Sequence, residues 1–249
     1  MKKNGNLLLA FLPYLCFWLL YDAMKLYPNY RFRPVHIADL YHIEKYYFGI
    51  FDTASSTYIT PNEFWATHTN SLLDLWSGFC YITWVPVPLL LAAYWYYSNK
   101  KMFWQFTTVF LGANMLGFVI YYIYPAAPPW YIATYGFDFY PNTSGSPAGL
   151  TRVDNLLGIE LFKNMYNMSS NVFAAMPSLH SANPMTVILC AWKNVGKIGK
   201  ILFSIHAMGI WFAAVYLGHH YILDVIAGIS CAIMAYSIVL LTRFWTKTN

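Results

Sequence analysis

Hydrophobic residues along this chain gather into long runs separated by two aromatic-rich segments of mixed polarity. A helix of about 20 apolar residues crosses the hydrocarbon core of a bilayer, so the runs predict membrane-spanning helices. The six predicted spans are Leu7–Tyr21, Leu72–Tyr97, Phe103–Tyr124, Ser181–Trp192, Ile201–Leu217 and Tyr221–Phe244. The fourth is the shortest. We therefore expect its helix to begin earlier, near Phe173, with Pro177 in its first turn, where proline is tolerated.

The two intervening segments, Lys25–Ser71 and Pro125–Ala175, are the long loops of this arrangement. Their many aromatic residues are typical of segments that lie at the membrane surface or fold over a site. Lys2 and Lys3 precede the first apolar run as in a secretory leader, but no small-residue cleavage site follows, so we expect a retained helix. Without an internal repeat, the pattern predicts one membrane-embedded all-α domain over residues 1–249.

Composition supports the membrane assignment. Of the 249 residues, 58% are hydrophobic and 10% are charged, whereas soluble domains carry about 25% charged residues. The four cysteines all fall inside apolar runs, in a spacing that fits neither a zinc site nor a disulfide framework. The formal net charge of +5 is modest and does not indicate a nucleic-acid partner.

The distribution of basic residues predicts the orientation, because short cytoplasmic loops are enriched in lysine and arginine. One side carries nine of them in four short segments: Lys2, Lys3, Lys100, Lys101, Lys193, Lys197, Lys200, Arg243 and Lys247. The other side carries six over much longer loops: Lys25, Arg31, Arg33, Lys45, Arg152 and Lys163. The first side is therefore predicted to be cytoplasmic, and both long loops face outward.

Two clusters of polar residues lie at span ends on this predicted outer face, where ionisable groups are costly and usually functional. The first is Met176-Pro177-Ser178-Leu179-His180, and the second is the segment 218–224, which reads Gly-His-His-Tyr-Ile-Leu-Asp. A single histidine near a helix end is more often an interface residue than a catalyst. Two clusters on one face favour catalysis.

His220 and Asp224 are four residues apart and so share one face of a helix. A carboxylate beside an imidazole can accept its Nδ1–H and fix the tautomer, which leaves Nε2 as a nucleophile or base. His180 can then protonate a departing alkoxide. These three residues suffice for double-displacement phosphoryl transfer without a metal ion or a cofactor.

The clusters resemble signatures of the type 2 phosphatidic acid phosphatase superfamily, which also contains lipid phosphotransferases. Its Pro-Ser-Gly-His motif appears here as Pro177-Ser178-Leu179-His180, and its Ser-Arg-x5-His-x3-Asp motif has Ala213-Ala214 in place of Ser-Arg. The first signature, with its lysine and arginine, is missing. The segment 124–131 (Tyr-Pro-Ala-Ala-Pro-Pro-Trp-Tyr) and the His-His-Tyr sequence resemble the inositol phosphorylceramide synthase branch, over residues 21 to 235.

The resemblance implies that His220 is the nucleophile, Asp224 its orienting partner and His180 the acid and base. It also implies that Ser178, with backbone N–H groups at a helix N-terminus, holds phosphate oxygens. The missing superfamily cations must be replaced, since a phosphoryl transition state needs charge stabilisation. Arg152 is the first candidate for this role.

For several other polar residues, the sequence is compatible with two different roles. Lys25, the second candidate for phosphate binding, can equally reach lipid headgroups. Asp74 and Asp22 can bind sugar hydroxyls or form a salt bridge with a cation. His219 can bind substrate or lie at the interface, and four histidines have no assigned role: His36, His42, His68 and His206.

The leading hypothesis is a transferase that moves a phosphoryl headgroup, such as phosphoinositol, from a glycerophospholipid to a ceramide-like alcohol. A lipid phosphate phosphatase that releases the same intermediate to water is the first alternative. A lipid binder or transporter without catalysis is the second. The short chain favours a bacterial inner membrane with a periplasmic site over a eukaryotic secretory membrane with a luminal one. The sequence does not predict the oligomeric state.

Overall fold

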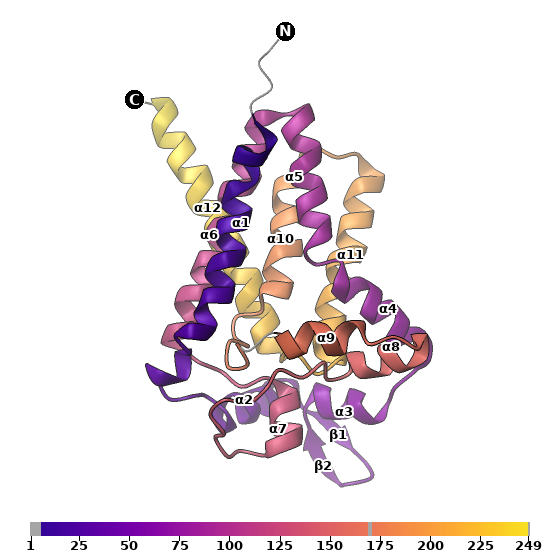
Figure 1. Cartoon of the computed structure of the whole chain (residues 1–249). Helices are drawn as coiled ribbons and strands as arrows, with labels where there is room; N and C mark the ends of the chain where they lie inside the picture. The colour runs from indigo at the N-terminus through magenta and orange to yellow at the C-terminus, as the bar shows by residue number, and fades with distance from the viewer. Residues whose placement is uncertain (1–5, 169–170, 249) are drawn as a thin grey trace.

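A computed structural model describes residues 6–168 and 171–248 of the chain. Long helices form a bundle, and smaller elements form a layer that closes one end of it (Figure 1). The bundle helices are α1 (Leu7–Ala23), α4 (Ser71–Ile82), α5 (Pro86–Ser98), α6 (Lys100–Ile123), α10 (Leu179–Ala191), α11 (Lys197–Tyr216) and α12 (Ile222–Thr248). The start of α1 and the end of α12 lie at the end of the bundle opposite the layer.

Four segments of these helices are long and apolar enough to cross a membrane: Leu7–Leu26, Lys100–Ile123, Lys197–Tyr216 and Ile222–Thr242. A fifth is added if α4 and α5, which meet at an angle of 43°, form one broken span. The chain is therefore an integral membrane protein. By length and composition, however, the described residues provide four or five spans rather than the predicted six.

The predicted span Leu72–Tyr97 is divided into α4 and α5 by a break at Thr83–Val85. Pro86 begins α5, and a proline there has no N–H to donate to the preceding turn, while its ring clashes with the carbonyl four residues earlier. The break turns Trp84 toward the interior of the bundle, where its indole contacts the ring of His180 at a centroid distance of 4.4 Å.

The prediction that the fourth span begins near Phe173 is wrong, because α10 begins at Leu179. The residue before a proline is disfavoured in helical conformation, which applies to Met176. The preceding backbone is also engaged elsewhere: the N–H of Ala126 donates to the carbonyl of Phe173, and the N–H of Ala175 donates to the carbonyl of Ala126. The non-helical segment thus brings Ala175 close to the start of α10.

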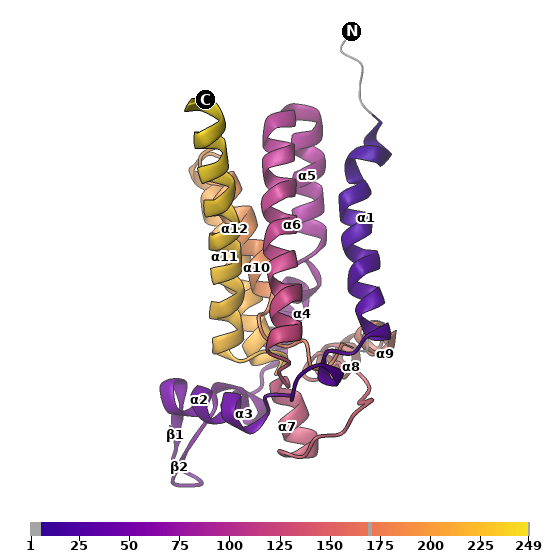
Figure 2. The same cartoon turned by 90° about the vertical axis from the view of Figure 1, so that its left-hand side faces the viewer.

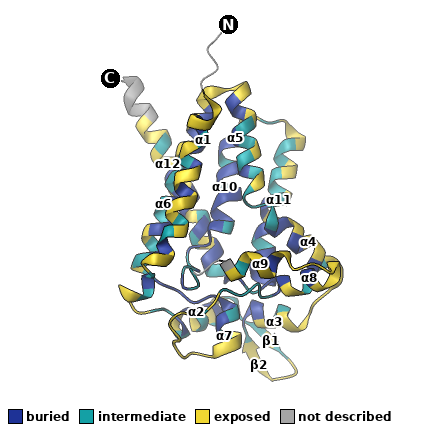
Figure 3. Cartoon of the chain, in the orientation of Figure 1, coloured by how far each residue is buried: buried dark blue, intermediate teal, exposed yellow. Residues whose placement is uncertain are grey.

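Helix α10 forms the centre of the bundle and is buried along most of its length (Figure 3). It packs against α6, α11 and α12. Ser181 on α10 donates its hydroxyl to the carbonyl of Val225 on α12, at 2.9 Å. Gly228 allows this close approach, since a Cβ atom there would lie 2.0 Å from the Ser178 carbonyl oxygen. The two helix ends that carry His180 and His220 are therefore held together by backbone contact.

The outer layer consists of the two predicted long loops, and both are largely ordered into short elements (Figure 2). The first contains η1 (Met24–Leu26), η2 (Asn29–Arg31), α2 (Ala38–Phe48), β1 (Ile50–Asp52), β2 (Thr57–Ile59) and α3 (Pro61–Thr67). The second contains α7 (Pro129–Tyr135), α8 (Leu150–Leu157) and α9 (Leu161–Met168). The strands pair antiparallel, with Ile50 opposite Ile59, so this hairpin is an addition to the predicted all-α fold.

Candidate active site

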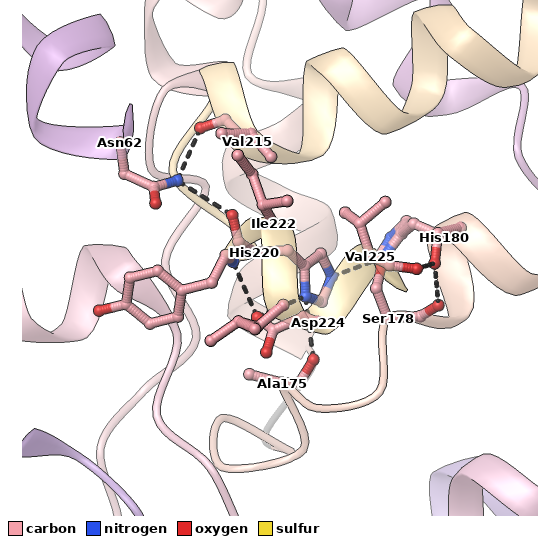
Figure 4. A network of polar contacts seen from close by, with 12 residues as sticks. Asn62, Ala175, Ser178, His180, Val215, His220, Ile222, Asp224 and Val225 are labelled. Carbon is pink, nitrogen blue, oxygen red and sulfur yellow. Dashed lines mark hydrogen bonds and ion pairs between the residues drawn. The ribbon is translucent and has the colours of Figure 1, made fainter. Parts of the chain in front are cut away.

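The structure brings together the three residues that the sequence predicts to be catalytic (Figure 4). His180 is the second residue of α10, His220 lies in the turn between α11 and α12, and Asp224 lies in the first turn of α12. The Nδ1 atom of His180 and the Nε2 atom of His220 are 3.0 Å apart. The two histidines therefore form a directly hydrogen-bonded pair beneath the outer layer.

The hydrogen bonds of His220 define its tautomer. Its Nδ1 atom lies 3.0 Å from the carbonyl oxygen of Ala175, which can only accept, so Nδ1 carries the proton. In the neutral ring, Nε2 then has a free lone pair. His180 must donate its Nδ1–H to that lone pair in the resting state. The Nε2 atom of His220 is thus uncovered only when His180 moves aside or another molecule separates the two rings.

Asp224 lies further from His220 than a direct hydrogen bond requires. Its Oδ2 atom is 3.5 Å from His220 Nδ1, while it accepts the Tyr221 N–H at 2.8 Å. Asp224 is fully buried, and the Ala175 carbonyl is the nearer partner of the imidazole. We infer that the carboxylate stabilises a cationic His220 through charge, and that the carbonyl oxygen fixes the tautomer.

The turn that carries His220 is held by several backbone contacts. Gly218 has a φ of +75°, in the left-handed region that favours glycine. The carbonyl of Ala214 then accepts the N–H groups of both His219 and His220. From the outer layer, the buried Asn62 side chain donates to the Val215 and His220 carbonyls at 2.8 and 2.9 Å (Figure 4). The first long loop therefore helps to fix the position of the histidine turn.

Glu44 on α2 provides a second support from the outer layer. Its carboxylate is fully buried and accepts the N–H groups of Ile222 and Leu223, at 2.9 and 3.1 Å. These are the first two N–H groups of α12, which have no partner within the helix, and the helix dipole favours negative charge there. Burial nevertheless raises the pKa of Glu44 from 4.5 to about 7, with the nearby Asp224 adding to the rise.

The Glu44→Gln variant should lose a pH dependence of stability that the wild-type chain has. The folded state keeps the Glu44 proton between pH 4.5 and about 7, where the unfolded state releases it. The free energy of unfolding of the wild type therefore falls as the pH rises through this window, and this contribution is constant above it. Thermal unfolding in detergent between pH 5 and 8 measures the difference between the two proteins.

Glu160→Gln is the matched control, since Glu160 is an exposed carboxylate in a surface ion pair with Lys163. This control should keep the wild-type slope. If Glu44→Gln also kept that slope, Glu44 would not be the titrating group at the start of α12.

His219 lines a small cavity together with His180 and His220. Its ring stacks between Tyr81 and Tyr166, at centroid distances of 5.0 and 4.8 Å. Its Nε2–H donates to the carbonyl of Pro147 at 3.1 Å. Burial lowers the pKa of His219 to about 3, so this imidazole is neutral at physiological pH. It contributes shape and hydrogen bonding rather than positive charge.

Two cavities meet at the histidine pair. The larger, of about 530 Å³, is mostly apolar and is lined by α1, the α4–α5 break and α9, with His180 and His220 at its polar end. The smaller, of about 80 Å³, lies on the outer side and is lined by the three histidines together with Trp130 and Ser146. Among the described residues that line these two cavities there is no lysine or arginine.

Arg152 and Asp74 lie together, but not in these two cavities. Arg152 Nε is 2.8 Å from Asp74 Oδ1, which also accepts the Tyr216 hydroxyl at 2.9 Å. Of the two interpretations of Asp74, sugar binding or a salt bridge, the salt bridge is thus present. Arg152 lines a third, outer cavity instead of the space beside the histidines. In this arrangement its guanidinium is paired with Asp74, and its role in phosphate binding stays a prediction.

Lys25 and Ser178, the other two predicted phosphate ligands, also make contacts within the chain. Lys25 pairs with Asp22 at the surface, with Nζ 2.5 Å from Oδ1. This is the salt bridge that was one of the two interpretations of Asp22. Ser178 is fully buried, and its N–H donates to the Asp224 carbonyl at 2.9 Å. Its hydroxyl has no partner among the described residues. Here Ser178 links α10 to α12, and its N–H is not available to a phosphate.

Glu44 and Asn62, both in the first long loop, support the histidine turn but were not predicted from the sequence. A local signal existed for Asn62: Thr60 and Glu63 form a capping box with Pro61 between them, which marks the start of a helix. No comparable signal marks Glu44. Within residues 6–168 and 171–248, no three histidine, cysteine, aspartate or glutamate side chains converge as a metal site requires.

Comparisons with known proteins identify the family of the chain. Phosphoinositol dihydroceramide synthase of Bacteroides thetaiotaomicron is 41% identical over 238 residues, which cover 93% of this chain and 76% of the relative. The catalytic subunit of inositol phosphorylceramide synthase from Saccharomyces cerevisiae is 31% identical over 242 residues, and the chain spans just over half (56%) of that protein. No solved structure gives a significant match. The model of the PAP2 superfamily matches residues 52–238, and the chain belongs to that superfamily.

Proposed function

We propose that this protein moves phosphoinositol from phosphatidylinositol to the hydroxyl of a ceramide-class lipid, through a phosphohistidine at His220. One observation carries the proposal: the Nε2 atom of His220 lies where an apolar cavity meets a small polar one. A phospholipid can place its tails in the first and its phosphate beside the imidazole. The names of the two relatives supply the headgroup and the acceptor class.

In the first half-reaction, the Nε2 lone pair of His220 attacks the phosphorus of the donor diester. The bond from phosphorus to the glycerol oxygen breaks. His180, protonated in the complex beside the anionic phosphate, gives its proton to that oxygen, so diacylglycerol leaves as a neutral alcohol. The headgroup stays on His220 as a phosphoramidate. The carbonyl of Ala175 and the carboxylate of Asp224 stabilise the imidazole as it becomes positive.

In the second half-reaction, His180 is neutral and acts as the base. It takes the proton of the ceramide hydroxyl, whose oxygen attacks the same phosphorus, and the bond between nitrogen and phosphorus breaks. His220 returns to its neutral form, and His180 is again cationic. Because the described cavity walls beside the histidines lack lysine and arginine, phosphate charge is met by His180 and by wall donors such as Trp130 and Ser146.

The proposal includes a membrane arrangement. Helix α10 is shorter than the thickness of the hydrocarbon core, but α6, α11 and α12 enclose it. Because it contacts these helices rather than lipid, we count it as the sixth span. Both long loops then lie on the non-cytoplasmic side, in agreement with the distribution of basic residues. We place the protein in a bacterial inner membrane with a periplasmic site, acting as a single domain. A luminal site in a eukaryotic membrane would follow the same geometry.

A transfer assay tests the function. The purified protein in detergent is incubated with phosphatidylinositol that is labelled in the inositol ring, with and without ceramide, in the presence of EDTA. We expect labelled inositol phosphorylceramide only when ceramide is present.

Water-soluble label that is released at the same rate with or without ceramide would instead identify a hydrolase. The absence of turnover with this donor, in a sample that binds ceramide, would contradict the assignment of the headgroup. A loss of transfer in EDTA that is restored by a divalent ion would contradict the metal-independent mechanism.

A further inference from the structure

A third cavity, of about 360 Å³, lies in the outer layer beyond the histidine turn. Its walls come from α2, α3, α7, the start of α8 and the segment Tyr216–Tyr221. Helices α3 and α7 lie near each other on the layer side of the bundle in both views (Figures 1 and 2). The volume falls within the range of about 300 to 1,000 Å³ that is typical of small-molecule sites.

The outer cavity and the small polar cavity have two wall residues in common, Trp130 and Ser146. Two backbone hydrogen bonds join the segments of this shared wall to the residues just before His219 and His220. The N–H of Trp130 donates to the Gly218 carbonyl at 3.0 Å, and the N–H of Gly149 donates to the Leu217 carbonyl at 2.9 Å. The three cavities therefore follow one another in the order apolar, small polar and outer, with the histidine pair at the first junction.

The polar groups of the outer cavity differ from those beside the histidines. Arg152 brings a cation, and Glu63 brings a carboxylate that accepts the Tyr41 hydroxyl at 2.9 Å. The hydroxyls of Thr60 and Tyr216 add groups that both donate and accept. Two residues of this lining, Arg152 and Asn62, each have a buried polar atom without a partner among the described residues, Nη2 and Oδ1 respectively. A lipid tail would leave both atoms unsatisfied, and a second phosphate would be repelled by Glu63. A neutral ring that carries several hydroxyls can satisfy both donors and acceptors.

We propose that the outer cavity binds the polyol ring of the donor headgroup. This inference rests on the proposed function, and it places the phosphate in the small polar cavity, between the ring and the lipid. The ring enters between Trp130 and Ser146 and reaches the groups around Arg152 and Glu63. Selection among phospholipid headgroups then takes place in the outer layer, away from the atoms that react.

Two alanines at the mouth of the cavity allow a test that leaves the histidines untouched. Ala66 on α3 and Ala133 on α7 line the cavity and are exposed. Ala66→Trp and Ala133→Trp fill it from opposite walls. Ala54→Trp, at an exposed alanine of the β1–β2 turn that does not line the cavity, is the matched control. The measurements are KM and kcat for phosphatidylinositol, and binding of inositol 1-phosphate by ligand-observed NMR.

We expect each mouth variant to raise KM by at least roughly tenfold with little change in kcat, as the loss of two hydrogen bonds predicts. Both should also weaken inositol 1-phosphate binding, and Ala54→Trp should match the wild type. Wild-type KM and binding in both mouth variants would overturn the proposal. So would a fall in kcat at unchanged KM, which would indicate damage to the histidine turn.

The binding measurement separates this inference from the proposed function. If the wild type does not transfer phosphoinositol, the function is wrong, yet loss of inositol 1-phosphate binding in the mouth variants would still support a polyol site. If the wild type does not bind inositol 1-phosphate but does turn over phosphatidylinositol, the function stands and the polyol site is overturned.

Discussion

Replacing His220 with alanine should abolish transfer, lowering kcat by roughly 10⁴-fold or more, in the range seen when a covalent catalyst is removed. Among the described histidines beside the junction of the apolar and small polar cavities, the other two cannot replace the His220 lone pair. The Nδ1–H of His180 donates to His220. The second nitrogen of His219 belongs to a ring that is stacked between two tyrosines. The defect should be in kcat, since His220 is not needed to hold the lipid tails.

The phosphohistidine itself can be measured. Wild-type protein incubated with ring-labelled phosphatidylinositol without acceptor should retain acid-labile label on the chain, and His220→Ala should retain none. His42→Ala is the control, because His42 is an exposed histidine of the outer layer outside both histidine cavities. Label on the His220→Ala chain, or transfer above about a tenth of the wild-type rate, would exclude His220 as the nucleophile.

Replacing His180 with glutamine should reduce transfer from phosphatidylinositol by roughly 10²- to 10⁴-fold, the usual contribution of a general acid. Glutamine keeps a hydrogen-bond donor near His220 but cannot deliver a proton to the glycerol oxygen. The reduction should depend on the leaving group, because an alcohol needs protonation and a phenol with a low pKa does not.

A donor that carries 4-nitrophenol in place of diacylglycerol provides the comparison. With this donor, we expect the first half-reaction of His180→Gln to approach the wild-type rate, while His220→Ala remains inactive with both donors. An equal loss with the two leaving groups would show that His180 acts by positioning His220 through their 3.0 Å contact rather than by proton transfer.

Sequence patterns predicted well the relative positions of residues that lie close together in the chain. The four-residue spacing of His220 and Asp224 places both near the start of α12, and the order of the two motifs brings His180 to the same level of the bundle. The helical content of the spans also followed from hydrophobic runs. These features depend on local periodicity, which a single chain displays directly.

Features that depend on contacts between distant segments were not predicted. Glu44 and Asn62 meet the histidine turn across more than 150 positions of the chain. The capping box around Asn62 marks the start of a helix but does not indicate this contact. For Arg152 the sequence predicted phosphate binding, which stays a prediction, and a salt bridge with a cation was one of two interpretations of Asp74. The pairing of these two residues is a tertiary contact, made possible where α8 packs against α4.

The two corrections to helix boundaries have a common cause in proline. Pro86 divides the second run, and Pro177 precedes α10 instead of lying in its first turn. In both places a continuous apolar pattern suggested a continuous helix, because hydrophobicity reports burial or lipid contact and not backbone hydrogen bonding. Both departures from a regular helix lie beside the histidine pair: Trp84 contacts His180, and the Ala175 carbonyl binds His220.

The apolar cavity next to the histidine pair has a volume suited to one lipid end at a time. In the proposed reaction, diacylglycerol leaves from this cavity and the ceramide-class alcohol enters the same space. The enzyme must then release its first product before it accepts its second substrate, which is a ping-pong kinetic order. Diacylglycerol would compete directly with the acceptor for the modified enzyme, so the rate of sphingolipid synthesis would respond to the diacylglycerol content of the surrounding membrane.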